Sequence, residues 1–291
     1  MRLPRTLWVG VLYTALLGVL VVGCAKQAPE PSQPGATTPA APSGKRDASA
    51  AKPSSAKTPP TAGKLGPGDK IKPAEPVALK AADGVALDAG WRPTAAKAKA
   101  GAVLVPMLGH AREDYDGFAQ ALAGYGVASL AVSLRGHGKS AAPGGKARDQ
   151  FTTDDWKKAK QDIAAAVDQV RSKVDGAPVI IVGASIGANL AVAYAAEQPD
   201  KVKGLVLMSA GLDYHGVTLA EPFAKIKSKP MLVIGSADDS QAVPVAKLQT
   251  MHEGGKAFTM LQYDGSDHGT DLLSKHAQIV TKVTDWLTKL R

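Results

Sequence analysis

The sequence has almost no cysteine: Cys24 is the single one in 291 residues. The chain that follows it therefore holds no disulfide and no catalytic thiol, and a zinc site built from several cysteines is excluded. The sequence also lacks a His-x-x-x-His pair, a carboxylate cluster and a Gly-x-Gly-x-x-Gly motif after a strand. We therefore expect neither a metal nor any other cofactor.

Aromatic residues are scarce as well, at 5% of the chain, and none interleave with basic clusters. The net charge of +9 belongs mainly to the N-terminal part, where residues 1–75 hold ten Lys/Arg against four Asp/Glu. The remaining residues hold 25 basic against 22 acidic side chains. This distribution favours adhesion to an anionic surface over nucleic-acid recognition.

The N-terminus combines a basic start with a short apolar run. Arg2 and Arg5 precede the uncharged residues 7–23, and this run is shorter than the roughly 20 residues that a bilayer span needs. A basic start, an apolar middle and small residues at the end are typical of a secretory signal peptide. We expect residues 1–23 to be one.

The end of that run, Val21-Val22-Gly23-Cys24, resembles the processing box of bacterial lipoproteins. By this resemblance Cys24 becomes the lipidated first residue of an exported protein anchored to the cell envelope. Ala25 is not the aspartate associated with inner-membrane retention, which implies the outer membrane if the source is Gram-negative. A plain membrane anchor or a buried cysteine is the alternative.

Large apolar residues are almost absent from the next segment, which consists mainly of Pro, Ala, Ser, Thr, Gly and Lys. Such a composition cannot bury enough surface to offset the loss of chain entropy on folding. We expect residues 24–75 to be a disordered tether that its prolines keep extended. The remaining residues, 76–291, suit one domain.

Strand and helix patterns alternate along residues 76–291. Two alternating runs around Asp83-Gly84 predict an antiparallel hairpin. Alternation of apolar strands with helices then predicts an α/β fold with a mostly parallel sheet covered on both faces. The expected strands are 102–107, 127–134, 179–182, 204–209, 231–235 and 257–263, and the expected helices are 114–124, 156–174, 188–197, 243–253 and 270–290.

The central feature is Gly183-Ala-Ser185-Ile-Gly187, between an apolar strand and a helix of small residues. A serine at a tight strand-to-helix turn, flanked by residues small enough for strand and helix to pack, is typical of a nucleophile elbow. The amide of Ile186, at the helix start, can then point at an oxyanion. A turn chosen only for close packing is the alternative.

Further motifs follow in a fixed order, and together with the elbow they resemble an α/β-hydrolase. The resemblance is to the lidless or small-lid esterase, lysophospholipase and dienelactone-hydrolase-like group, with a signature shared by S33 serine aminopeptidases. It covers residues 76–291 and rests on these pieces: Asp83-Gly84, Leu108-Gly-His-Ala-Arg-Glu-Asp114, Leu134-Arg-Gly-His-Gly-Lys-Ser140, the elbow, Gly235-Ser-Ala-Asp238 and Asp267-His-Gly269.

The resemblance implies a Ser-Asp-His triad. Ser185 would be the nucleophile, His268 the general base, and Asp238 the acid that orients the histidine, with Asp239 as the neighbour that could replace it. A solvated loop histidine and carboxylate are the alternatives. The second oxyanion amide would be that of Leu108, although the chain has Pro106-Met107 where relatives commonly have His-Gly.

The other histidines have less specific settings. His137 is expected in a structural loop. His110 could line the oxyanion loop, but this is the less favoured of its two possible positions. His252 and His276 fall on expected helices, where solvent exposure is the ordinary outcome.

The resemblance implies a membrane-tethered serine carboxylesterase that acts on small to medium acyl esters. Only about 20 residues separate two strands where many relatives carry a lid, so we expect an open site. Amide hydrolysis is less favoured, because peptidases with this signature usually have a cap. The alternative is a non-catalytic envelope lipoprotein that uses the hydrolase scaffold for binding or a structural role. Acyl length, the choice between ester and amide, and the oligomeric state stay open.

Overall fold

A computed structural model describes residues 70–252 and 257–290 of the chain. The expected signal peptide, Cys24 and the tether up to residue 69 lie outside the described residues. Within them, no helix is both long and apolar enough to cross a membrane.

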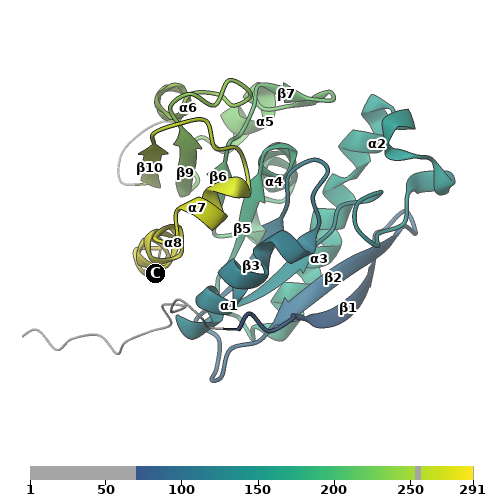
Figure 1. Cartoon of the computed structure of the whole chain (residues 1–291), viewed down its shortest axis with the longest axis horizontal. Coiled ribbons are helices and arrows are strands. Elements are labelled where there is room, and N and C mark those ends of the chain that lie inside the picture. The colour runs from purple at the N-terminus through teal and green to yellow at the C-terminus, as the bar shows by residue number, and fades with distance from the viewer. Residues whose placement is uncertain (1–69, 253–256, 291) are drawn as a thin grey trace, which may run out of the picture. The chain divides into compact units, whose positions relative to one another are not determined.

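The described chain is built on a mixed sheet of eight strands (Figure 1). The strand order is β1-β2-β4-β3-β5-β6-β9-β10, and only the pairs β1–β2 and β2–β4 are antiparallel. The expected mostly parallel sheet with an N-terminal hairpin is therefore confirmed. The bounds are β1 Glu75–Lys80, β2 Ala86–Arg92, β3 Ala100–Val105, β4 Val127–Val132, β5 Val179–Ala184, β6 Gly204–Met208, β9 Met231–Ser236 and β10 Phe258–Tyr263.

The central strands β3, β4, β5, β6 and β9 are buried along their whole length. Continuous apolar runs of this kind are what a parallel sheet requires when helices cover both of its faces. One core cluster packs α3 and α4 on one face, and the other packs α1 and α8 on the opposite face (Figure 1). The helices are α1 Asp116–Gly124, α2 Thr153–Lys158, α3 Lys160–Lys173, α4 Ile186–Glu197, α5 Ala220–Lys225, α6 Val245–Met251, α7 Asp271–Lys275 and α8 Ile279–Thr288.

Two expected helices are each divided in two. The expected helix 156–174 is broken at Ala159, whose N–H donates to Trp156 O, three residues back, so that α2 and α3 are separate. The expected helix 270–290 is broken between α7 and α8, where His276 leaves the helical region and its ring stacks on Tyr263. The second break coincides with this stacking contact between His276 and Tyr263. A contact between two elements far apart in the sequence cannot be predicted from helical periodicity.

The segment of about 20 residues between β6 and β9, for which the sequence predicts no strand or helix, contains a short hairpin and a helix. Strands β7 (Asp213–Tyr214) and β8 (Val217–Thr218) pair antiparallel, and α5 follows them. His215 and Gly216 form the turn, both with positive φ, as two-residue hairpin turns require.

A buried charged group joins the N-terminal hairpin to the rest of the fold. The Arg135 side chain is fully buried and donates to Asp162 of α3 at 2.6 Å and to Asp83 in the β1–β2 turn at 2.7 Å. Removing one partner of such a pair leaves an uncompensated charge, so the motif around Arg135 is structural. His137, in the same loop, is buried and its Nδ1 contacts Arg135 O at 3.0 Å, as expected for a structural histidine.

Candidate active site

Ser185 lies between β5 and α4 with backbone angles of φ +53° and ψ −120°. A non-glycine residue in this region is strained, and such strain persists only where the surrounding structure enforces it. The Ser185 N–H donates to Met208 O at 2.8 Å, which fixes the turn to the end of β6. The backbone therefore has the conformation of a nucleophile elbow.

The glycines of the elbow are required by close backbone packing. A Cβ on Gly183 would lie 2.5 Å from Gly187 O, and a Cβ on Gly187 would lie 2.6 Å from Val105 O and 2.7 Å from Pro106 O. The start of α4 thus lies directly against the end of β3. Ile186, the expected oxyanion donor, is the first residue of α4, where helix amides have no partner within the helix.

The loop after β3 carries the second expected oxyanion donor, Leu108. Its side chain is exposed, and Met107 beside it is buried. The Met107 side chain packs directly against Gly269, because a Cβ on Gly269 would lie 2.5 Å from the Met107 sulfur. The Pro-Met sequence therefore packs this loop against the segment that follows His268.

His268 is paired with Asp239, not with Asp238. The Nδ1 atom of His268 lies 2.8 Å from Asp239 Oδ2 and 3.0 Å from Oδ1, and the Asp239 side chain is only 2% exposed. The structure therefore does not bring Asp238, the expected acid, to His268; the carboxylate beside the ring is that of Asp239, the neighbour named as its alternative.

The backbone after β9 explains this choice. Ala237 N–H donates to Tyr263 O and Asp238 N–H to Gly265 O, so the chain continues alongside the end of β10 beyond Ser236. Residues 237 and 238 form a turn, in which Asp239 N–H lies 3.5 Å from Ser236 O. Asp238 is exposed at this turn, while the Asp239 side chain contacts His268.

Three side chains that the sequence did not single out hold the His268 loop. Ser236 donates to Asp267 O at 2.9 Å, Ser209 accepts from Gly269 N–H at 2.9 Å, and Thr270 donates to Asp114 Oδ2 at 2.9 Å. Ser209 follows β6 directly, and Ser236 is the last residue of β9. Polar residues at the carboxyl ends of parallel strands were the one sequence signal that could have identified these two serines.

Asp114 connects this loop to the loop after β3. The same oxygen that accepts from Thr270 lies 2.5 Å from His110 Nδ1. His110 thus belongs to the expected oxyanion loop and anchors it through Asp114.

Tyr214, on β7, lies against both candidate catalytic side chains. Its ring is edge-on to the His268 ring at 6.4 Å between centroids. Burial raises the pKa of the Tyr214 phenol, and a hydrogen bond with the Ser185 side chain opposes that rise. Ser185 itself is only 4% exposed.

The remaining histidines pack in the structure. His252 is buried, with Nε2 2.9 Å from Lys229 O, and His276 stacks on Tyr263. The expectation that both are solvated is wrong, because each ring packs against the β10 side of the sheet. No group of three or more potential metal ligands occurs in the described residues.

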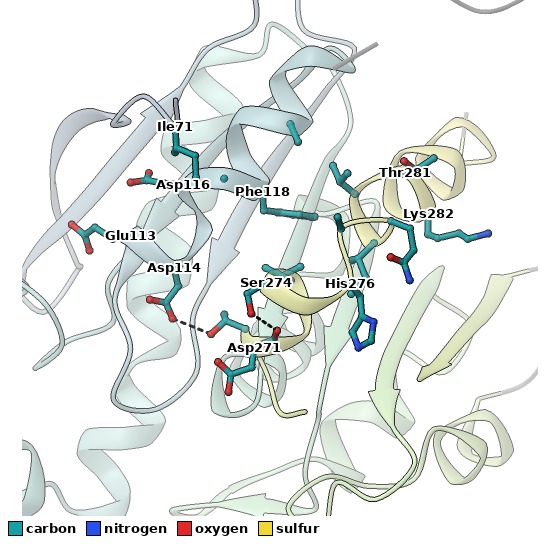
Figure 2. A pocket seen from close by; sticks show the side chains of 18 of the residues that line it. Ile71, Glu113, Asp114, Asp116, Phe118, Asp271, Ser274, His276, Thr281 and Lys282 are labelled. Atoms are coloured by element: carbon teal, nitrogen blue, oxygen red, sulfur yellow. Dashed lines mark hydrogen bonds between the residues drawn. The ribbon is translucent and has the colours of Figure 1, made fainter. Parts of the chain in front are cut away.

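A separate cavity of about 990 Å³ lies between α1 and α7–α8 (Figure 2). Phe118 lies on its inner wall, and the Asp114–Thr270 hydrogen bond lies at its edge. Ser185, Asp239 and His268 are not among the residues that line it. The cavity adjoins the loop anchor and not the candidate nucleophile.

Comparison with known proteins agrees with this geometry. The profile of the serine aminopeptidase S33 family matches residues 96–237. A monoglyceride lipase homologue of monkeypox virus is 27% identical over 95 residues, which are 33% of this chain and 32% of the viral protein. The match thus spans about a third of that relative's length.

Solved structures resemble the whole described domain. An esterase of Pyrococcus furiosus is 16% identical with a TM-score of 0.61, covering 75% of this chain and 91% of its own. A serine hydrolase without a lid from Xanthomonas campestris is 18% identical with a TM-score of 0.55, covering 76% and 97%. The sheet order, the elbow and these similarities together show that the described residues have the α/β-hydrolase fold.

Proposed function

We propose that this protein is a serine hydrolase that cleaves carboxylic esters. The observation that carries the proposal is the His268–Asp239 pair, whose ring contacts Tyr214, together with a serine at positive φ in a strand-to-helix elbow that Tyr214 also contacts. Three separate segments would have to converge by accident to form this arrangement without a catalytic role.

In the proposed reaction Ser185 Oγ attacks the ester carbonyl while His268 Nε2 takes its proton. The amides of Ile186 and Leu108 stabilise the oxyanion, and His268 then protonates the departing alcohol. Water activated by His268 releases the acid. Asp239 accepts from Nδ1, which keeps the imidazole in the tautomer that leaves Nε2 free to accept a proton.

Ester hydrolysis is favoured over peptide hydrolysis, although the matched family is named for an aminopeptidase. The chain between β6 and β9 forms only a two-stranded hairpin and the six-residue α5, which offers little surface to hold a peptide. Small to medium esters fit a site in which Ser185 is largely covered.

The test is covalent labelling of the full-length chain with a fluorophosphonate, followed by peptide mapping, with Ser185→Ala as the control. We expect one adduct, on Ser185, that is absent from the variant. Ser185 and His268 share no side-chain hydrogen bond in the described structure, which favours a non-catalytic scaffold as the second candidate. An unlabelled but folded protein would establish that second candidate.

We also propose that the protein is exported and attached to the cell envelope through lipidated Cys24. The basic, apolar N-terminus and the Val-Val-Gly-Cys box support this location. Incorporation of radioactive palmitate tests it: we expect label in the native chain and none in Cys24→Ala. Label in neither would contradict lipidation.

A further inference from the structure

Tyr214 stands over the candidate nucleophile on a hairpin that is fixed to the nucleophile helix. Asn189 of α4 lies four residues after Ser185 and is fully buried. Its Nδ2 donates to Gly211 O at 2.9 Å and to Val217 O at 2.8 Å, and its Oδ1 accepts from Gly211 N–H at 3.2 Å. One buried amide thus holds both ends of the segment 211–217.

The turn of the hairpin is held from the other side. The His215 ring stacks on the Trp156 ring with 4.9 Å between centroids. A Cβ on Gly216 would lie 2.4 Å from the Thr153 side chain. The hairpin is therefore packed against α2 as well as α4, and it does not have the loose attachment of a lid that opens and closes.

The Tyr214 side chain is fixed just as closely. Its hydroxyl lies 3.1 Å from Ser209 O and 2.9 Å from Gln241 O, which are carbonyls on two different loops of the site. Its ring fills the space above Gly211, where a Cβ would lie 2.4 Å from the ring carbon that bears the hydroxyl. The two carbonyl acceptors and the contact with Gly211 hold the Tyr214 ring in one position, against His268 and beside Ser185.

We propose that Tyr214 is the specificity-determining residue of this site: it limits the size of the substrate group that lies on the β6 side of Ser185. This inference rests on the proposed esterase function. Because the hairpin is anchored at Asn189 and Trp156, the ring cannot withdraw to admit a large group. A substrate must fit beside it, and small groups fit best.

The experiment compares the full-length chain with Tyr214→Ala and Tyr214→Phe on two ester series. One series is of p-nitrophenyl esters with acyl chains from acetate to decanoate. The other is of acetate esters with alcohols of increasing length. The measured quantity is the ratio of kcat/KM for the longest ester to that for the shortest.

In Tyr214→Ala we expect this ratio to rise about tenfold or more in one series, since single methylenes in apolar pockets already change discrimination by about tenfold. The series that responds identifies the substituent beside Tyr214. In Tyr214→Phe the ratio stays within about twofold of the native value, because the ring keeps its volume while the hydroxyl is lost.

An unchanged ratio in both series would overturn the inference, provided that Tyr214→Ala still reacts with a fluorophosphonate. Tyr214→Leu, which keeps an apolar side chain over Gly211, serves if the alanine variant unfolds, and the same rise is expected. An unchanged ratio differs from a failure of the esterase proposal itself. In that case the native chain would neither react with the fluorophosphonate nor hydrolyse any ester.

Discussion

At the scale of single residues, the two neighbouring aspartates have opposite environments. Asp239 is buried against His268, and its Oδ1 also accepts from Gln241 N–H at 3.1 Å. The Asp238 N–H donates to Gly265 O beyond the end of β10, and Asp238 is exposed to solvent. Only Asp239 is therefore placed to orient His268 as the proposed mechanism requires.

We expect Asp239→Asn to lower kcat/KM for a small ester by roughly 10³–10⁴-fold, because the amide no longer stabilises the His268 cation or fixes its tautomer. Asp238→Asn is the matched control and should remain within about threefold of the native protein. Steady-state hydrolysis of p-nitrophenyl acetate measures both. Equal losses in the two variants would remove Asp239 from the proposed triad.

Sequence reasoning could place the elbow serine and the histidine loop, but it could not decide which aspartate lies beside His268. The elbow is encoded locally, by glycines that must be small, and His268 lies in a short loop after the last strand. Which aspartate contacts His268 depends on the turn after β9, and backbone hydrogen bonds from Ala237 and Asp238 to Tyr263 and Gly265 fix that turn. Nothing in the local sequence of Asp238-Asp239 distinguishes the two.

At the scale of elements, the β7–β8 hairpin and α4 behave as one unit joined by Asn189. Neither the hairpin nor its anchor was predicted, since two-residue strands have no usable periodicity and a buried asparagine resembles any other helical polar residue. The sheet, in contrast, was predicted well because its strands are continuous apolar runs.

Asn189→Ala should lower the free energy of unfolding by about 3 kcal/mol, because it leaves three buried backbone groups without a partner. Urea denaturation measures the loss. The exposed Gln198, at the end of the same helix, provides the control, and Gln198→Ala should stay within about 0.5 kcal/mol of the native value. If both variants denature alike, the hairpin is not held by Asn189.

At the scale of the whole molecule, the loop 134–140 joins the N-terminal hairpin to the main sheet and contributes a pH dependence. Burial lowers the pKa of His137, and its Nδ1 donates to Arg135 O in the neutral form. The unfolded chain therefore binds a proton near pH 6.5 that the folded chain does not. The stability contributed by neutral His137 is complete above that pH and falls as the pH decreases below it.

His137→Asn keeps a donor near the Nδ1 position but does not titrate. We expect the native protein's stability relative to this variant to fall by about 1 kcal/mol between pH 7.5 and pH 5.5, measured by urea denaturation at both values. Because both proteins share every other titrating group, their difference isolates His137. A difference that is the same at both pH values would contradict a lowered pKa.

The position of β10 at the edge of the sheet has a consequence for the timing of synthesis. Chains emerge from the ribosome N-terminus first, and β10 pairs only with β9 in the described sheet. The elbow can form once β3, β5 and β6 are present, but the His268 loop is held in place only after β10 has paired. A chain in which β10 has not yet paired would therefore have a formed elbow without its proposed base, and the proposed hydrolase would stay inert until β10 had joined the sheet.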